Sequence, residues 1–252
     1  MAIQKTLSEH INEALKQSQF DKFVCDIIET IPVNVILTSA AYKWISLYKT
    51  DYRKFVEQEF SKTHINKLKF QQFLTVKYFY EWVLQKDFIP SLPALPHEIN
   101  NVLNIGAGVG LFDIYLKGLY PNVNLNFIEL DEYDEISHFD LRLEKLEGKI
   151  NAITLLKENL DENNVHKFNI FKPEEAVYIE DSSIDLVLSF RSWSFLYPVE
   201  TYSKIVQKIL TKNGKIICDV LKSNYDKFSE YFNIISDIGE GDSLIRVLAE
   251  NK

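Results

Sequence analysis

Three of the eight glycines in this 252-residue chain lie within five residues, at Gly106, Gly108 and Gly110. Because glycine has no Cβ, such a loop can turn sharply out of a strand and let a ligand lie against bare backbone at the start of a helix. Glu129 follows about twenty residues later, at the distance where a carboxylate can accept hydrogen bonds from both hydroxyls of a ribose. The pattern predicts a site for a ligand that contains adenosine.

The spacing of the loop is G-x-G-x-G, and Leu111 occupies the position where a dinucleotide fingerprint has its third glycine. This departure argues against a nicotinamide dinucleotide as the ligand. A tight turn with no ligand is the structural alternative for the glycines alone.

The elements that would position this loop fall into two regions on either side of Pro90, Pro93 and Pro96. Before the prolines, apolar residues recur every three to four positions, which is typical of amphipathic helices. We expect an all-helical N-terminal cap in residues 1–89, an extended proline-rich connector in 90–97 and the ligand-binding domain in 98–252. The expected helices of the cap are 6–17, 19–30, 34–48, 51–60 and 62–86.

Strand and helix patterns alternate after the connector, which predicts βαβ units and a parallel sheet with helices on both faces. Only six residues separate the last two strand-like segments, too few for a parallel crossover, so this pair must form an antiparallel hairpin. The expected elements are strand 102–105, helix 111–120, strand 124–130, helix 150–163, strands 167–171 and 184–190, helix 201–210, strand 215–221, and the hairpin strands 231–236 and 243–249.

Residues 98–250 resemble the class I S-adenosyl-L-methionine-dependent methyltransferases, on the glycine loop, Glu129 and the terminal hairpin. The resemblance implies an α/β fold with a Rossmann-like seven-stranded methyltransferase sheet and an antiparallel C-terminal hairpin. It also implies S-adenosyl-L-methionine as cofactor. The cofactor-binding residues implied are Asn104, Gly106, Ala107, Gly108, Gly110, Glu129, Leu130, Asp131, Phe171, Lys172, Ser189 and Phe190.

Residues 185–198, taken with 152–160, resemble a group of bacterial methyltransferases assigned to small polar acceptors such as sugars. Some members have a histidine just before a Tyr-Pro pair, where this chain has Leu196, so no catalytic role is carried over. The expected function is methyl transfer to a hydroxyl of a small polar metabolite. The alternative is a non-catalytic protein of the same fold that binds the cofactor and acts as a partner or subunit.

Four side chains are candidates for binding the acceptor. Arg191 would bind a carboxylate or phosphate, and Trp193 and Tyr197 would stack on a sugar or an aromatic ring. Tyr78, in an aromatic helical stretch, would reach the methionine carboxylate of the cofactor. The structural alternatives are a surface arginine and aromatic side chains that only pack in the core.

His138 is the candidate general base, because histidine titrates near neutral pH and lies here in an acidic, aromatic insertion after Asp131. A solvent-facing loop histidine is the alternative. The carboxylates of the insertion are interpreted as a solvated face, and we expect no metal.

The net charge of −8 argues against a general nucleic-acid binder, since no basic run spans a face. The longest uncharged apolar stretch, 31–42, is shorter than the ~20 residues that span a bilayer. Cys25 and Cys218 are far apart in sequence, which favours a reducing cytoplasm. We therefore expect a cytoplasmic protein with a small-molecule acceptor and no nucleic-acid or membrane partner. The sequence leaves open whether the chain forms a homodimer.

Overall fold

The structure is a computed structural model that describes Val83 and residues 86–130 and 152–252. The chain divides into two compact units. Among the described residues, the first contains Val83, 109–119 and 152–166, and the second contains 86–108, 120–130 and 167–252. The expected helices before residue 83 lie outside the described residues.

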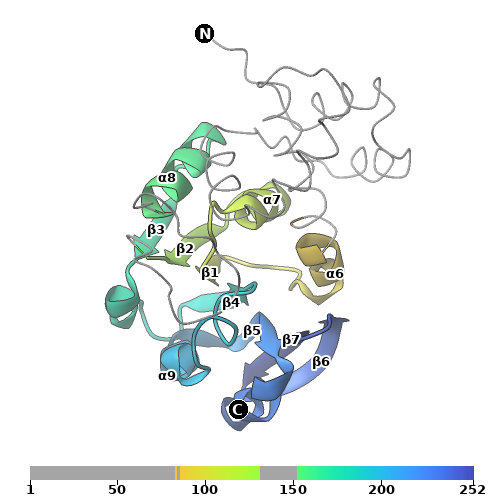
Figure 1. The fold of residues 1–252 in the computed structure, drawn as a ribbon. Helices are drawn as coiled ribbons and strands as arrows, with labels where there is room; N and C mark the ends of the chain where they lie inside the picture. The colour runs from red at the N-terminus through yellow and green to blue at the C-terminus, as the bar shows by residue number, and fades with distance from the viewer. Residues whose placement is uncertain (1–82, 84–85, 131–151) are drawn as a thin grey trace, which may run out of the picture. The chain divides into compact units, whose positions relative to one another are not determined.

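The described residues form a seven-stranded sheet in the order β3-β2-β1-β4-β5-β7-β6, as Figure 1 shows. This confirms the predicted Rossmann-like methyltransferase sheet with its antiparallel C-terminal hairpin. Strands β1 to β5 pair in parallel, whereas β7 is antiparallel to both β5 and β6. The strands are β1 (Asn101–Ile105), β2 (Asn124–Ile128), β3 (Phe168–Phe171), β4 (Ile184–Ser189), β5 (Leu210–Leu221), β6 (Phe232–Glu240) and β7 (Leu244–Asn251).

Two strands exceed their predicted lengths by three or more residues. β5 begins at Leu210, directly after helix α9 (Glu200–Ile209), and β6 continues to Glu240. Exposed polar residues in these extensions hid the strands from a hydropathy pattern, because backbone pairing and not burial defines them. The pairing register of β6 shifts twice, between Ile234 and Ser236 and between Asp237 and Gly239.

The core of the second unit is aromatic and aliphatic and lies against the middle strands. Trp193, Phe228 and Phe232 are buried and form ring contacts with centroids 5.0–5.7 Å apart. The central strands β1 and β4 are almost wholly buried, as expected of parallel strands.

The first unit contains helices α7 (Leu111–Leu119) and α8 (Ala152–Glu162). Gly110 has φ +67°, and a Cβ there would lie 2.8 Å from Leu156 Cδ1. Asn159 Nδ2 also donates to the Val109 carbonyl at 2.5 Å. The third glycine is therefore required by the close approach of α8, whatever ligand the loop binds.

The connector corrects one expectation, since it is not extended throughout. It contains the helical turn α6 (Ile89–Ser91) and the 3-10 turn η2 (Leu92–Ala94). Each has a proline in its first turn, where the missing N–H is not needed. The 3-10 turns η3 (Pro173–Tyr178) and η4 (Lys222–Asn224) and helix α10 (Tyr225–Tyr231) were also not predicted.

In the part of the chain that the structure describes, no helix is long and apolar enough to cross a membrane. The same residues contain no group of three or more His, Cys, Asp and Glu side chains that would hold a metal ion.

Candidate functional site

The carboxyl ends of β1, β2 and β3 lie in register at one edge of the sheet. Ile105 is paired with Ile128, and Ile128 with Phe171. The Gly106 N–H donates to the Ile128 carbonyl at 3.0 Å, and the Glu129 N–H donates to the Phe171 carbonyl at 3.0 Å. In open α/β sheets this edge is where ligands bind, and the first glycine and Glu129 both lie on it.

The Glu129 side chain is buried and joins the glycine loop. Its Oε2 accepts from the Gly108 N–H at 3.0 Å, and its Oε1 accepts from the Leu130 N–H at 3.0 Å. Gly106 and Gly108 have φ of +75° and +62°, a region that favours glycine. The expected pairing of loop and carboxylate is therefore present as a direct contact.

The donor set fits an adenosine ligand. A carboxylate has about four acceptor positions, so one that already accepts backbone N–H groups can also accept from ribose hydroxyls. Leu130 and Phe171, expected beside the adenine, are half-buried at the same edge. The site thus combines an acceptor for hydroxyls with apolar surface for a base.

The remaining expected cofactor residues differ in their surroundings. Asn104 is buried on β1, Ala107 is half-buried in the loop, and the Lys172 N–H donates to Glu175 Oε2 at 2.9 Å. Ser189 Oγ donates to the Ile105 carbonyl at 3.0 Å and accepts from the Trp193 N–H at 2.9 Å. Ser189 therefore closes the turn after β4.

Ser192 is a residue that the sequence pattern did not single out. A Cβ added to Gly106 would lie 2.1 Å from Ser192 Oγ, so the hydroxyl lies directly against the bare α-carbon of the first glycine. The Ser192 carbonyl accepts from the N–H groups of Phe195, Leu196 and Tyr197, which holds the turn in place. A side chain at Gly106 would therefore clash with Ser192.

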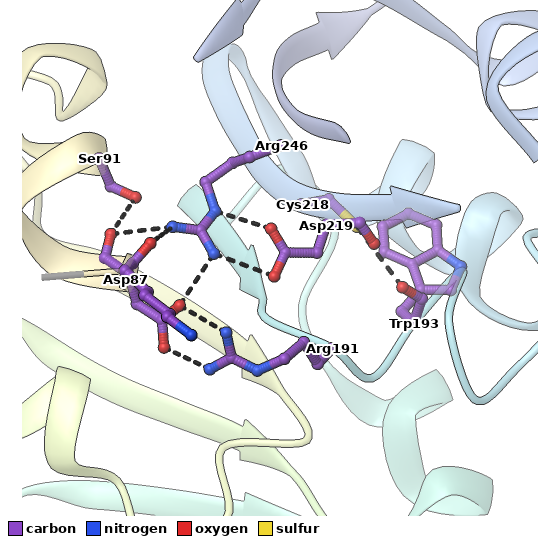
Figure 2. A network of polar contacts seen from close by, with 8 residues as sticks. Asp87, Ser91, Arg191, Trp193, Cys218, Asp219 and Arg246 are labelled. Carbon is purple, nitrogen blue, oxygen red and sulfur yellow. Dashed lines mark hydrogen bonds and ion pairs between the residues drawn. The ribbon is translucent and has the colours of Figure 1, made fainter. Parts of the chain in front are cut away.

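Arg191 has both ends of its guanidinium engaged by a carboxylate. Its Nη1 donates to Asp87 Oδ1 at 2.8 Å and its Nη2 to Asp87 Oδ2 at 2.5 Å (Figure 2). Arg191 also has φ +55°. This contact connects the residues before α6 to the turn after β4.

Asp87 also pairs with a second arginine, which Figure 2 shows on its other side. Arg246 Nη2 donates to Asp87 Oδ1 at 2.9 Å, and its Nε donates to Asp219 Oδ1 at 2.7 Å. The guanidinium of Arg246 also lies 4.5 Å from the Phe190 ring centroid. We call Asp87, Arg191, Asp219 and Arg246 the buried charge network.

The charges of this network balance. Burial disfavours the charged form of Arg246, yet hydrogen bonds and negative charge from Asp219 and Asp87 raise its pKa above the ordinary value. Arg246 and both aspartates are less than a tenth exposed, whereas a quarter of the Arg191 side chain is exposed.

Trp193 lies in the core and not on the site surface. It has no exposed area, and its Nε1 donates to the Val199 carbonyl at 2.8 Å. This burial matches the structural alternative, in which the aromatic side chain packs in the core and does not stack on the acceptor.

Tyr197 is half-buried and contacts Tyr202 edge to face at 6.1 Å. Burial, and then the negative charge of Glu129, raise the pKa of Tyr197.

Asp131, His138 and Tyr78 lie outside the described residues. Asp87, Ser192, Asp219 and Arg246 are the site-edge residues that sequence reasoning missed. The available signal was a charged residue inside an apolar strand, since Asp219 follows Ile216, Ile217 and Cys218.

No family model matches the chain. Ribosomal RNA small subunit methyltransferase G of Malacoplasma penetrans is 34% identical over 80 residues, so the match spans about a third of either protein, 32% of each.

Many solved structures are similar at low identity, and two serve as examples. A SAM dependent methyltransferase from Aquifex aeolicus has a TM-score of 0.47 and 13% identity, covering 64% of this chain and 89% of that one. Precorrin-6y C5,15-methyltransferase from Geobacter metallireducens has a TM-score of 0.45 and 13% identity, covering 65% and 85%. The strand order with its antiparallel β7, and not these likenesses, defines the fold as that of the class I methyltransferases.

Proposed function

We propose that this protein binds S-adenosyl-L-methionine and transfers its methyl group to a hydroxyl of a small polar acceptor. The observation that carries the proposal is the buried Glu129 carboxylate joined to the Gly108 N–H at the carboxyl edge of the sheet. A single carboxylate can accept hydrogen bonds from both vicinal hydroxyls of a ribose. When bound, the cofactor supplies an electrophilic methyl group on a sulfonium.

The residues of this chain would hold and orient the reactants. Glu129 would accept from the ribose, Leu130 and Phe171 would flank the adenine, and the glycine loop would lie along the ligand. Catalysis of methyl transfer depends mainly on alignment and exclusion of water, and the aligned ends of β1, β2 and β3 would help to align the reactants. We keep His138 as the proposed general base. Arg191 and Tyr197 are kept as the proposed acceptor-binding residues.

The first experiment measures cofactor binding by calorimetry on three proteins. The parent should bind S-adenosyl-L-methionine and S-adenosyl-homocysteine, and Glu129→Gln should weaken both about 10- to 150-fold, since a hydrogen bond to a charged group contributes about 1.5–3 kcal/mol. Glu180→Gln, at an exposed position, is the matched control and should bind as the parent does. A parent that binds neither ligand would contradict the proposal.

The acceptor class needs a separate experiment, because the similarity to a ribosomal RNA methyltransferase favours RNA as a second candidate. The net charge of −8 opposes it, since RNA binding requires neutralised phosphates. A labelled methyl group should enter a pool of small metabolites and not ribosomal RNA. Cofactor binding without transfer to either pool would favour the non-catalytic alternative.

A further inference from the structure

Arg191 lies at the edge of the sheet where the ends of β1 and β4 meet. Ser189, the last residue of β4, donates to the carbonyl of Ile105 at the end of β1, and Arg191 follows two residues later. A quarter of the Arg191 side chain is exposed. Ligands of open α/β sheets bind beyond these strand ends, so an acceptor bound there lies beside this arginine.

The fork of the Arg191 guanidinium is occupied by Asp87, as Figure 2 shows. Nη1 donates to Asp87 Oδ1 and Nη2 donates to Asp87 Oδ2. Two parallel bonds of this kind are how an arginine binds the carboxylate or phosphate of a ligand. The chain therefore supplies its own anion to Arg191, and the positive charge is compensated before any acceptor binds.

Asp87 is held in this position by groups other than Arg191. Arg246 Nη2 donates to Asp87 Oδ1 at 2.9 Å, and Arg246 Nη1 donates to the main-chain carbonyl of Asp87 at 3.1 Å. The Ser91 hydroxyl donates to the same carbonyl at 2.6 Å. The Asp87 side chain is 5% exposed. An anion that displaced it from Arg191 would leave a buried carboxylate with fewer partners, which costs free energy.

Two further charged groups bear on the charge of the acceptor. Arg246 donates to both oxygens of Asp219, from Nε at 2.7 Å and from Nη2 at 3.0 Å, so its positive charge is compensated as well. Glu129 places a buried negative charge at the end of β2, on the same edge of the sheet. A second anion near these carboxylates would be repelled by them.

We propose that the acceptor carries no net negative charge, and that Asp87 determines this specificity by neutralising Arg191. The inference rests on the proposed function and names its substrate class, an uncharged polar metabolite as opposed to a phosphorylated or acidic one. A neutral ion pair is polar, so it suits an acceptor that offers hydroxyl groups and gives no net attraction to an anion.

The experiment sorts methylated products by charge. The parent protein transfers a labelled methyl group from S-adenosyl-L-methionine to a pool of small metabolites, and a cation-exchange resin removes the unreacted cofactor. An anion-exchange resin then retains acidic and phosphorylated products. Most of the label should pass through this second resin. Label that is mostly retained there would overturn the inference and leave the proposed function standing.

Asp87→Asn keeps the size of the side chain and removes the charge that compensates Arg191. The ratio of retained to unretained label should rise about tenfold, as expected when a charged group gains an anionic partner. Asp219→Asn is the matched control, because it takes the same charge from the network and leaves both bonds between Arg191 and Asp87 in place. Its ratio should stay close to that of the parent.

Circular dichroism shows whether each variant is folded. An unchanged ratio in folded Asp87→Asn would overturn the role of Asp87, and so would an equal rise in Asp219→Asn. If Asp87→Asn does not fold, the ratio measured for the parent decides whether the acceptor is uncharged.

Glu129→Gln separates this inference from the proposed function. It acts on the cofactor, so it should lower the label in both fractions and leave their ratio unchanged. If the parent binds no cofactor and places label in neither fraction, the proposed function fails and this inference fails with it.

Discussion

The carboxylate of Asp87 and the guanidinium of Arg191 face each other across 104 residues of sequence, joined by two parallel hydrogen bonds of 2.8 and 2.5 Å. The same carboxylate accepts from Arg246, which in turn pairs with Asp219. One aspartate before the sheet thus connects the turn after β4 to the C-terminal hairpin. The turn after β4, which lies beside the glycine loop, is therefore bonded to a residue far away in the sequence.

Removing Asp87 should destabilise the fold strongly. Asp87→Ala leaves two buried or half-buried arginines without this partner, and breaking a buried pair in this way costs about 3–5 kcal/mol. Urea unfolding measures the free energy. Asp181→Ala removes an exposed ion pair with Lys208 and should cost less than about 1 kcal/mol. Equal costs for the two variants would show that the network adds nothing beyond a surface pair.

Gly106 should not tolerate a side chain, for two separable reasons. A Cβ would lie 2.1 Å from Ser192 Oγ, and φ of +75° strains an alanine by about 1–3 kcal/mol. Gly106→Ala should therefore lower the free energy of unfolding, and adding Ser192→Gly should recover the steric part but not the part due to φ.

Gly241→Ala is the control for that series, because nothing lies closer than 3.9 Å to its added Cβ. Its free energy of unfolding should equal that of the parent or slightly exceed it. If the added Ser192→Gly recovered nothing, the contact between Ser192 and Gly106 would be disproved.

Cys218 should be inert in the native protein. Burial, followed by the negative charge of Asp219, raises the pKa of the thiol well above its ordinary value, so little thiolate forms. In a Cys25→Ser background, a thiol reagent at pH 8 should react only as fast as the protein opens, and rapidly in denaturant. Fast labelling under native conditions would contradict the complete burial of Cys218.

Stability should fall at alkaline pH through the tyrosines beside the site. Burial and the charge of Glu129 raise the pKa of Tyr197, and burial does the same for Tyr202. Because the folded-state pKa is above the unfolded value of about 10, the contribution is constant below pH 10 and is lost as pH rises further. Tyr197→Phe should flatten this decline in the free energy of unfolding between pH 9 and 11, and an unchanged slope would contradict the assignment.

The sequence alone is sufficient to predict the sheet, the glycine loop and the partnership of that loop with Glu129. These features depend on local signals, namely alternating apolar segments, residues without Cβ, and a carboxylate at the end of the next strand. Parallel strands align their carboxyl ends, so spacing along the chain becomes proximity at one edge. The hairpin was predictable for a different reason, because the six residues between the two predicted strands are too few for a parallel crossover. In the structure three residues, 241–243, separate β6 from β7.

Only the tertiary structure shows how the side chains after β4 are used. Trp193 and Arg191 look alike in sequence as candidates for acceptor binding, yet one is packed in the core and the other is bonded to Asp87. Ser192 belongs to no sequence motif, and only the fold brings its side chain against Gly106. Such contacts join residues some 80 to 100 positions apart, and no local pattern encodes them, because they arise from which strands become neighbours when the core is buried.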